Sequence, residues 1–287
     1  MLRVALPNKG RLANQTITLF EKAGLKAESR VERALVATLG SDFQAIFVRA
    51  QDIPEFVGDG AADLGVTGAD LVAESGQSVR ELLDLQFGRC RLALAVRDES
   101  STRHVDDLEA GTRVATSFPR VAEAFFRERG LEMRIAPVSG SAEIAPHLGV
   151  ADVIVDLVST GSTLRVNGLR EIATLLHSTA RLIANGSAAD DPHKGPRIAE
   201  LVVALESVIR AAAKRYLMAN VPRDRLEEVK EIIPGLSGPT IVEIQNGGRW
   251  VAAHAVVDAD RIYQTITRLK AIGAEGILVT PIERLTP

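Results

Sequence analysis

Short apolar runs alternate with amphipathic segments over the first 184 residues, which is the pattern of an α/β fold with a largely parallel sheet. Apolar positions that repeat every second residue predict strands, and those that repeat every three or four residues predict helices. In the first part of the chain we expect strands at 2–6, 34–39, 43–49 and 91–97, helices at 12–23 and 52–58, and a strand, tight turn and helix start within 63–70.

The same alternation begins again after the polar stretch 98–106, where we expect a second lobe. Its predicted elements are a strand at 113–116, a helix at 119–129, a strand at 133–137, a helix at 142–148, a strand at 152–158 and a helix that begins near residue 161. Residues 185–196 combine Gly, Pro, Asn and Asp and give the strongest linker signal in the chain. An amphipathic helix follows, with an apolar face formed by Ile198, Leu201, Val202, Leu205, Val208, Ile209 and Ala212.

Beyond this helix the pattern changes to strand, helix, two strands, helix and strand, which is the βαββαβ order of ferredoxin-like domains. The predicted strands are 216–221, 240–245, 250–257 and 276–280, and the predicted helices are 223–233 and 259–272. A small module of this kind on an α/β body is more often regulatory or assembly-forming than catalytic. We therefore expect three units, which are lobe I at 1–97 with 178–211 returning to it, lobe II at 98–177, and a regulatory domain at 212–287.

Composition narrows the classes of function. Hydrophobic residues make up 46% of the 287 residues and charged residues 25%, as in globular proteins with a substantial core. The formal charge is 34 − 37 = −3, which argues against a general nucleic-acid or membrane surface. Cys90 is the only cysteine and the five histidines form no closely spaced pair, so an intrachain disulfide and a cysteine-based zinc site are excluded.

Targeting signals are not visible in the sequence. The amino-terminus reads as a strand and lacks the apolar stretch of about 7–15 residues that is typical of a signal peptide. The sequence contains no uninterrupted apolar run of about 18 residues. We therefore expect a cytoplasmic protein, with neither nucleic acid nor a membrane among its partners.

The segment 159–163, Ser-Thr-Gly-Ser-Thr, joins a buried-looking strand to a predicted helix start. Backbone N–H groups in such a turn can surround an anion, and the helix N-terminus adds partial positive charge. The hydroxyl side chains add hydrogen bonds, and Gly161 lets the backbone approach an anion closely. A phosphate monoester fits this description, and a plain strand-to-helix turn with a Ser or Thr cap fits it equally well.

The position of Asp156 favours the interpretation of this segment as a phosphate site over a plain capped turn. It interrupts an apolar strand, where an unpaired carboxylate is costly, and it lies near the carboxyl end of that strand, where ligands bind in open α/β sheets. A carboxylate there can accept hydrogen bonds from vicinal ribose hydroxyls while the loop holds a 5′-phosphate. Glu143 offers a second acceptor, although a Glu in the first turn of a helix is by itself more often explained by the helix dipole.

Cations follow two other predicted strands. Lys9, Gly10 and Arg11 form a strand-to-helix junction, and Arg49 ends another strand. These positions suit a polyanion such as pyrophosphate or triphosphate about as well as they suit solvated surface cations. Asp70 is most simply a helix cap, and in a cluster with the other loops it would contact adenine, ribose or a metal-bound water.

Residues 143–164 resemble the signature of the ATP phosphoribosyltransferase family, E-x5-G-x-small-x2-I-x-D-L-x2-T-G-x-T-L. Every position of the signature is filled, by Glu143, Gly149, Ala151, Ile154, Asp156, Leu157, Thr160, Gly161, Thr163 and Leu164. Four further segments are similar to the family, namely Pro7–Leu12, Asp63–Gly68, Ala115–Pro119 and Pro234–Thr240. The resemblance covers essentially the whole chain, including the C-terminal module that separates the long form of the enzyme from the short form.

The resemblance implies transfer of the ribosyl 5-phosphate of phosphoribosyl pyrophosphate (PRPP) to N1 of the adenine of ATP, with release of pyrophosphate and with Mg²⁺ as cofactor. It also implies a two-lobed catalytic part of the type II periplasmic-binding-protein fold, an ACT-like C-terminal domain, and a homo-oligomer, a hexamer built from dimers. The reaction is the first step of histidine biosynthesis. Histidine bound at the C-terminal modules inhibits the long form, and Ser237 and Thr240 are the contacts that we expect for it in this chain.

Each candidate residue receives a role in this reaction. The 5′-phosphate would be held by Ser159, Thr160, Gly161, Ser162 and Thr163. Asp156 and Glu143 would hold the ribose hydroxyls and place negative charge near an oxocarbenium-like transition state. The leaving pyrophosphate or the ATP would be contacted by Lys9, which we also count as catalytic, and by Gly10, Arg11, Arg49 and Asp70. Mg²⁺ would bind mainly through substrate phosphates, because it keeps several waters and needs few protein ligands.

Other classes of protein share parts of this pattern. A solute-binding protein has the two-lobed fold but normally carries an export signal. An amino-acid-sensing regulator has the C-terminal module but does not need a phosphate loop. A metal-dependent hydrolase is disfavoured because the sequence shows no cluster of metal ligands.

Overall fold

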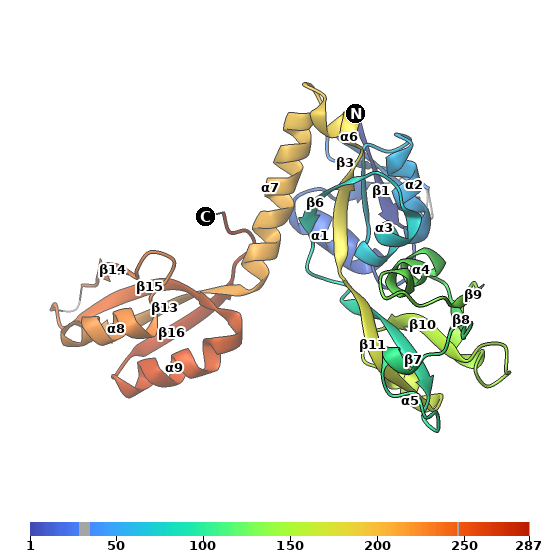
Figure 1. Ribbon diagram of the computed structural model, residues 1–287. Helices are drawn as coiled ribbons and strands as arrows, with labels where there is room; N and C mark the ends of the chain where they lie inside the picture. Colours follow the sequence, from blue (N-terminus) through green and yellow to red (C-terminus); the bar gives the residue numbers. More distant parts are fainter. Residues whose placement is uncertain (29–34, 246, 287) are drawn as a thin grey trace. The chain divides into compact units, whose positions relative to one another are not determined.

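The computed structural model describes residues 1–28, 35–245 and 247–286. The chain divides into two compact units, Met1–Val202 and Val203–Pro287. The first unit contains two lobes, each built on its own sheet, and the second unit contains a third sheet (Figure 1). Across the described ranges, no helix combines the length and the apolar character needed to cross a membrane.

Lobe I is built on a seven-stranded mixed sheet in the order β2-β3-β4-β1-β5-β12-β6. Its strands are β1 (Leu2–Pro7), β2 (Ala27–Glu28), β3 (Val36–Leu39), β4 (Phe43–Val48), β5 (Leu64–Gly68), β6 (Arg80–Asp84) and β12 (Ala180–Ala184). β1 runs parallel to β4 and β5, whereas β12 runs antiparallel to β5 and β6, so the sheet is less parallel than the sequence predicts. Residue 34 of the predicted strand 34–39 lies outside the described residues.

The helices of lobe I follow the ends of its parallel strands. They are α1 (Ala13–Lys22) after β1, the 3-10 turn η1 (Ala50–Asp52) and α2 (Ile53–Gly58) after β4, and α3 (Ala69–Ser75) after β5. Because β4, β1 and β5 are neighbours, their carboxyl ends lie along one edge of the sheet. Lys9, Arg49 and Asp70 come directly after these strand ends.

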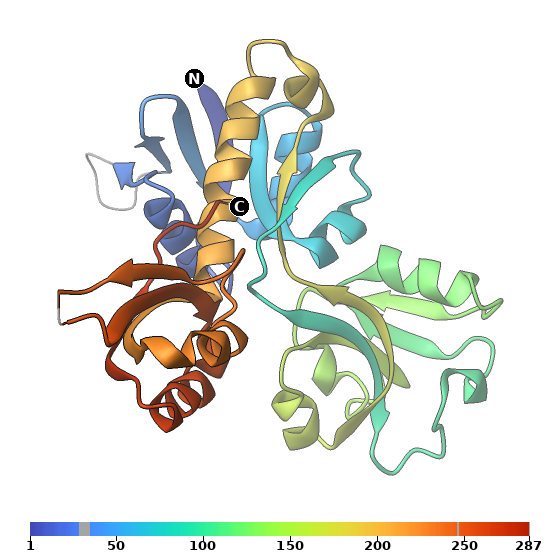
Figure 2. The same ribbon diagram turned by 90° about the vertical axis from the view of Figure 1, so that its left-hand side faces the viewer.

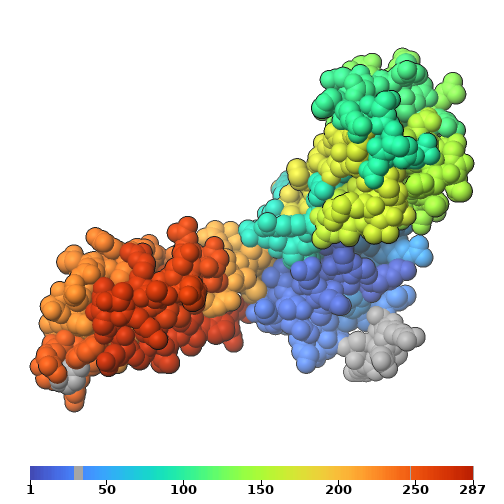
Figure 3. Space-filling model, turned by 90° about the horizontal axis from the view of Figure 1, so that it is seen from below, coloured from blue at the N-terminus to red at the C-terminus, as the bar shows by residue number. Residues whose placement is uncertain are grey.

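Lobe II is built on a five-stranded mixed sheet in the order β11-β7-β10-β8-β9. Its strands are β7 (Cys90–Arg97), β8 (Arg113–Thr116), β9 (Arg134–Pro137), β10 (Val153–Val158) and β11 (Leu169–Ser178). Its helical segments are η2 (Val105–Asp107), α4 (Pro119–Arg127), η3 (Ala142–Ile144) and α5 (Ser162–Val166). This lobe is made from one continuous stretch of chain, which is coloured green to yellow in Figure 3.

The sheet of lobe II is buried on both faces. On one face, Leu92 and Leu94 of β7 belong to a core cluster with the α4 residues Phe125 and Phe126. On the other face, the smaller side chains of β7 belong to a second cluster with Ile154, Val158, Ala142 and Leu164. The alternation along β10 therefore directs Asp156 to the face that η3 and α5 cover.

The boundary between the lobes lies before β7. The sequence predicts it at residue 97, but β7 pairs with β10 and β11 and so belongs to lobe II. The sequence pattern of an apolar strand is the same whichever sheet it joins, so only its hydrogen-bonding partners show which lobe it belongs to. The two connections between the lobes run side by side (teal and yellow in Figure 2). They are joined by backbone hydrogen bonds from Leu85 N to Ala180 O (2.9 Å) and from Ala180 N to Phe87 O (2.9 Å).

Two predicted segments differ in local structure. The helix predicted at 142–148 is only the 3-10 turn η3, because Pro146 has no N–H for a helical hydrogen bond and Gly149 has a φ of 68°. The predicted linker 185–196 contains the short helix α6 (Gly186–Asp190). Asn185 begins this helix, since its side chain accepts a hydrogen bond from Ala188 N. Helix α7 (Gly195–Ala212) follows as predicted.

The second unit has the predicted βαββαβ order. Its strands are β13 (Lys214–Pro222), β14 (Thr240–Glu243), β15 (Trp250–Asp258) and β16 (Glu275–Pro281), and its helical segments are η4 (Arg223–Arg225), α8 (Leu226–Ile232), η5 (Ala259–Arg261) and α9 (Ile262–Ala271). The sheet order β14-β15-β13-β16 is that of a ferredoxin-like fold, and both helices cover the same face (Figure 1). The unit begins inside α7, at Val203, whereas the sequence predicts its start at residue 212.

Candidate active site

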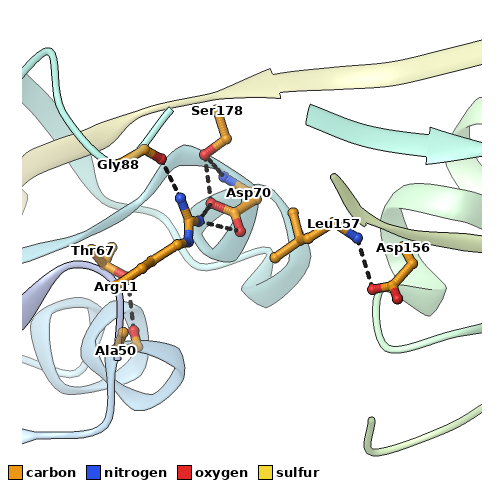
Figure 4. A network of polar contacts seen from close by, with 8 residues as sticks. All are labelled: Arg11, Ala50, Thr67, Asp70, Gly88, Asp156, Leu157 and Ser178. Carbon is orange, nitrogen blue, oxygen red and sulfur yellow. Dashed lines mark hydrogen bonds and ion pairs between the residues drawn. The ribbon is translucent and has the colours of Figure 1, made fainter. Parts of the chain in front are cut away.

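Asp156 lies near the carboxyl end of β10, on the face that η3 and α5 cover. Its carboxylate is partly buried and accepts a hydrogen bond of 2.7 Å from the backbone N–H of Leu157 (Figure 4). Burial raises the pKa of this carboxyl, and the nearby charge of Glu143 raises it further, while the hydrogen bond from Leu157 acts in the opposite direction. An ionised carboxylate at this position therefore lowers the stability of the folded protein.

The loop 159–163 begins directly after β10. Gly161 has a φ of 76°, a left-handed conformation that side-chain-bearing residues rarely adopt. Thr160 Oγ1 and Ser162 Oγ are 2.9 Å apart and share a hydrogen bond. The following helix, α5, has only five residues, so its dipole is small. Any attraction of an anion to this loop would therefore come mainly from the loop's own N–H and hydroxyl groups.

The structure brings all of the residues predicted to hold the 5′-phosphate and the ribose of PRPP to one cavity. This cavity has a volume of about 160 Å³ and is lined by Glu143, Asp156, Leu157, Val158, Ser159, Thr160, Gly161, Ser162, Thr163 and Leu164. Two carboxylates and a Gly-containing loop thus face the same space: Asp156 and the loop come from the end of β10, and Glu143 comes from η3. A sugar phosphate has groups complementary to these, with hydroxyls that can donate to the carboxylates at one end and an anion for the loop at the other.

Two arginines at the loop are missed by sequence reasoning. Arg91 Nη1 donates to Ser159 O and Arg165 Nη1 donates to Thr160 O, and the donor–acceptor distance is 3.4 Å in both hydrogen bonds. Arg91 is in β7, at the position that pairs with Val158, the last residue of β10. This pairing depends on the antiparallel register of β7 and β10, for which the sequence carries no signal that we recognise. Arg165, four residues after Gly161, directly follows the last residue of the signature, and this position could have pointed to it.

Arg11 and Asp70 come together in lobe I. The Asp70 side chain is almost fully buried (1% exposed) and forms an ion pair of 3.2 Å with the Arg11 guanidinium, which is 34% exposed. Asp70 also accepts a hydrogen bond of 2.5 Å from Ser178 Oγ, and Arg11 Nη1 donates to Gly88 O (Figure 4). Both side chains therefore have partners within the protein. The sequence-based interpretation treats them as two separate ligand-binding residues, whereas the structure shows them as an ion pair.

Lys9, Gly10 and Arg49 are exposed at the carboxyl ends of two neighbouring strands. β1 and β4 pair in parallel up to Pro7 and Val48, and Asn8 N donates to Val48 O over 2.8 Å. The chains that carry the two cations therefore leave the sheet next to each other. This edge can offer positive charge to a polyphosphate without any charge excess in the chain as a whole.

Metal and effector sites are less defined. Among the described residues, no group of three or more His, Cys, Asp or Glu side chains is placed to hold a metal ion. In the second unit, Ser237 is exposed in the turn before β14, and Thr240 is the first residue of that strand, paired with His254. Their assignment to a histidine site stays a prediction.

Comparison with known families gives a match over most of the chain. The family model described as ATP phosphoribosyltransferase matches residues 49–207, and the model described as HisG, C-terminal domain, matches residues 211–284. Both matches fall on the units that the sheets define, since the first covers much of the two lobes and the second covers the ferredoxin-like unit.

Individual relatives agree with the family match. A protein of Gemmatimonas aurantiaca named ATP phosphoribosyltransferase is 58% identical over 292 aligned residues that cover all of both chains. A protein of the same name from Methanopyrus kandleri is 48% identical over 288 residues, again with full coverage of both. Among solved structures, the ATP phosphoribosyl transferase (HisG:HisZ) complex from Thermotoga maritima matches with a TM-score of 0.64 and 30% identity, over 73% of this chain and 99% of that chain.

Proposed function

The chain belongs to the ATP phosphoribosyltransferase family, and from this premise we propose how its residues carry out the reaction. The enzyme joins the ribosyl 5-phosphate of PRPP to N1 of ATP and releases pyrophosphate, in the first step of histidine biosynthesis. The bond from ribose C1 to the pyrophosphate oxygen breaks with its electron pair, and the bond from C1 to the adenine nitrogen forms. ATP and PRPP are therefore its substrates.

We propose that the cavity of lobe II binds the ribose 5-phosphate part of PRPP. The observation that carries this proposal is the common cavity that Glu143 and Asp156 share with the loop 159–163. Loop N–H groups and hydroxyls would hold the 5′-phosphate, and the two carboxylates would accept hydrogen bonds from the ribose hydroxyls. Their negative charge would also stabilise the cationic ribose that develops as pyrophosphate leaves.

We propose that the strand ends of lobe I contact the pyrophosphate or the ATP triphosphate. Exposed Lys9 and Arg49 on neighbouring strands support this assignment, with Gly10 between Lys9 and Arg11. Arg11 keeps about a third of its side chain exposed, so the same guanidinium can pair with Asp70 and contact a phosphate oxygen. Asp70 would then act by orienting Arg11. Such positioning of charges is the main work of the protein here, because the substrates supply both nucleophile and leaving group.

The family needs a divalent metal ion for catalysis, and we propose that this ion is Mg²⁺. Because the described residues offer no three-ligand cluster, the protein fits a metal that is held mainly by substrate phosphates. Asp156 and Glu143 line the proposed phosphate cavity and would complete the coordination through water. The bound ion would neutralise charge on the leaving pyrophosphate.

We also propose that the enzyme is cytoplasmic, that it is a homo-oligomer of the dimer and hexamer type, and that histidine inhibits it through the second unit. The match of residues 211–284 to the C-terminal domain of the family supports a regulatory role for this unit. Substitution of Ser237 and Thr240 by Ala and Val in the full-length chain should weaken inhibition by histidine and leave the uninhibited rate unchanged. Unaltered inhibition in this double variant would remove both residues from the histidine site.

The experiment that tests the catalytic assignment follows pyrophosphate release from purified protein. Release should require ATP, PRPP and a divalent metal ion together, and the Asp156→Asn variant should lose most of it. A solute-binding protein or a stand-alone amino-acid sensor would bind its ligand and release no pyrophosphate. Rapid release by Asp156→Asn, with an unchanged KM for PRPP, would contradict the placement of ribose at this carboxylate.

A further inference from the structure

The loop 159–163 has two carbonyl oxygens that are each engaged by a guanidinium group. Arg91 Nη1 donates to Ser159 O and Arg165 Nη1 donates to Thr160 O. A Cβ atom added to Gly161 would lie 3.2 Å from Arg165 Nη1 and 3.9 Å from Arg91 Nη2, so both guanidinium groups pack closely on the loop at this residue. Arg91 does not line the proposed phosphate cavity and acts on the loop from outside it.

Arg91 is held in this place by a carboxylate on the neighbouring strand. Arg91 Nε donates to both oxygens of Glu171 (3.0 and 2.9 Å), and Nη2 donates to Glu171 Oε2 (2.6 Å). Thr174 Oγ1 in turn donates to Glu171 Oε1 over 2.7 Å. Hydrogen bonds from Arg91 keep the pKa of Glu171 below its usual value, so the carboxylate stays ionised as a partner for Arg91. The guanidinium is therefore fixed in position, with Nη1 directed at the loop.

The direction of the loop's peptide groups decides whether it attracts or repels an anion. A peptide that points its N–H at a phosphate attracts it, and one that points its C=O at the phosphate repels it. A guanidinium bound to a carbonyl oxygen opposes rotation of that peptide, because rotation would break a hydrogen bond to a charged donor. The two arginines thus favour the orientation in which the carbonyls of Ser159 and Thr160 face away from the cavity.

We propose that Arg91, fixed by Glu171, is a positioning residue that presets the loop 159–163 for the 5′-phosphate of PRPP. This inference rests on the proposed function, because it takes the loop as the phosphate site. Arg91 touches no reacting atom, so its effect belongs to PRPP binding. ATP binding and the chemical step should change little.

Steady-state kinetics of full-length variants test the proposal. Arg91→Met should raise the KM for PRPP about tenfold, as expected for loss of a hydrogen bond to a charged group, and should change the KM for ATP by less than about twofold. Arg91→Lys keeps a charged donor and should recover part of the loss. Arg80→Met is the matched control, because Arg80 also pairs with a carboxylate, that of Asp190, through two hydrogen bonds, but in lobe I. Its kinetics should equal those of the unmodified enzyme.

The double variant Arg91→Met/Glu171→Gln separates positioning from simple charge. If Arg91→Met acts only by leaving Glu171 unpaired near the phosphate, the double variant should bind PRPP normally, and that result overturns the proposal. If Arg91 positions the loop, the KM for PRPP should stay raised in the double variant. This variant has no unpaired charge, so it also provides a stable protein should Arg91→Met fold poorly.

Thr163→Val and Asp156→Asn distinguish failure of this inference from failure of the proposed function. If both raise the KM for PRPP or abolish turnover while Arg91→Met behaves as the unmodified enzyme, only the positioning role is wrong. If neither affects PRPP, the loop is not the phosphate site, and both proposals fail. Equal rises in the KM for PRPP and for ATP in Arg91→Met would also overturn the positioning role, because they indicate a general structural defect.

Discussion

Asp156→Asn removes a negative charge from the proposed ribose site and leaves its shape unchanged. Asn has the same size as Asp, and its side-chain oxygen can still accept the hydrogen bond from Leu157 N. The amide cannot hold two vicinal hydroxyls as a carboxylate does, because only one of its two polar atoms is an acceptor. The variant therefore tests charge and hydrogen bonding together, at a fixed position in β10.

The expected loss of activity follows from the number of free acceptor sites on this carboxylate. Leu157 N uses one of them, which leaves the others for the ribose. Loss of a single hydrogen bond to a charged group costs about 1.5–3 kcal/mol. At about 1.4 kcal/mol for each factor of ten, this lowers kcat/KM for PRPP by about 12- to 140-fold. Lost stabilisation of the cationic transition state adds to this figure.

The same substitution should make the free protein more stable at neutral pH. Burial raises the pKa of Asp156, so the folded state disfavours its ionised form. The penalty is absent below the ordinary carboxyl pKa of about 3.9, grows as the pH rises from there to the raised folded value, and is constant above it. Asp156→Asn removes this penalty, and we expect a gain of about 0.5–2 kcal/mol, the usual size for one stabilising substitution.

Thermal unfolding at several pH values, together with pyrophosphate-release kinetics, tests both halves of the prediction. The Tm difference between the variant and the unmodified enzyme should be positive at pH 7 and should shrink as the pH falls toward 4. A lower Tm for the variant at pH 7 would refute the assignment of Asp156 as a strained functional carboxylate. It would show instead that Asp156 is a structural residue whose charge stabilises the fold.

Three further predictions concern other parts of the first unit. Arg11→Met leaves the buried Asp70 without its cation and should lower the free energy of unfolding by about 3–5 kcal/mol in urea titrations. Arg80→Met, at an exposed ion pair, should lower it far less. Gly161→Ala forces a side chain into a left-handed conformation, so it should cost about 1–2 kcal/mol in the same titrations and should raise the KM for PRPP. Removal of divalent ions with EDTA should stop pyrophosphate release, and added Mg²⁺ should restore it; activity that persists in EDTA would contradict the metal requirement.

The parts of the fold that the sequence predicts well are those set by local pattern. The run from Val153 to Val158, followed by Gly161, specifies a buried strand and a turn without reference to the rest of the chain. The strands and helices of the second unit follow in the same way, and their antiparallel sheet matches the predicted order. Local pattern is enough wherever the side-chain period and the turn residues belong to the same segment.

The parts that the sequence does not predict depend on contacts between distant segments. β7 reads as a strand of lobe I until its pairing with β10 is known, and Arg91 becomes relevant to the loop only through that pairing. Arg11 and Asp70 are likewise 59 positions apart, and only the fold brings them together as an ion pair. Strand register and tertiary contacts determine these roles, and neither produces a periodic pattern of residues that could be recognised in the sequence.

The order of the strands in lobe I has a consequence for synthesis on the ribosome. β12 is hydrogen-bonded between β5 and β6, yet it is translated after every strand of lobe II. The first 84 residues therefore cannot complete their sheet until residue 184 has been made. Synthesis of the residues between 84 and 184 takes about 5–20 s at bacterial and eukaryotic elongation rates. We expect lobe II, whose strands are contiguous in the chain, to fold first, while the facing edges of β5 and β6 remain unpaired for that interval.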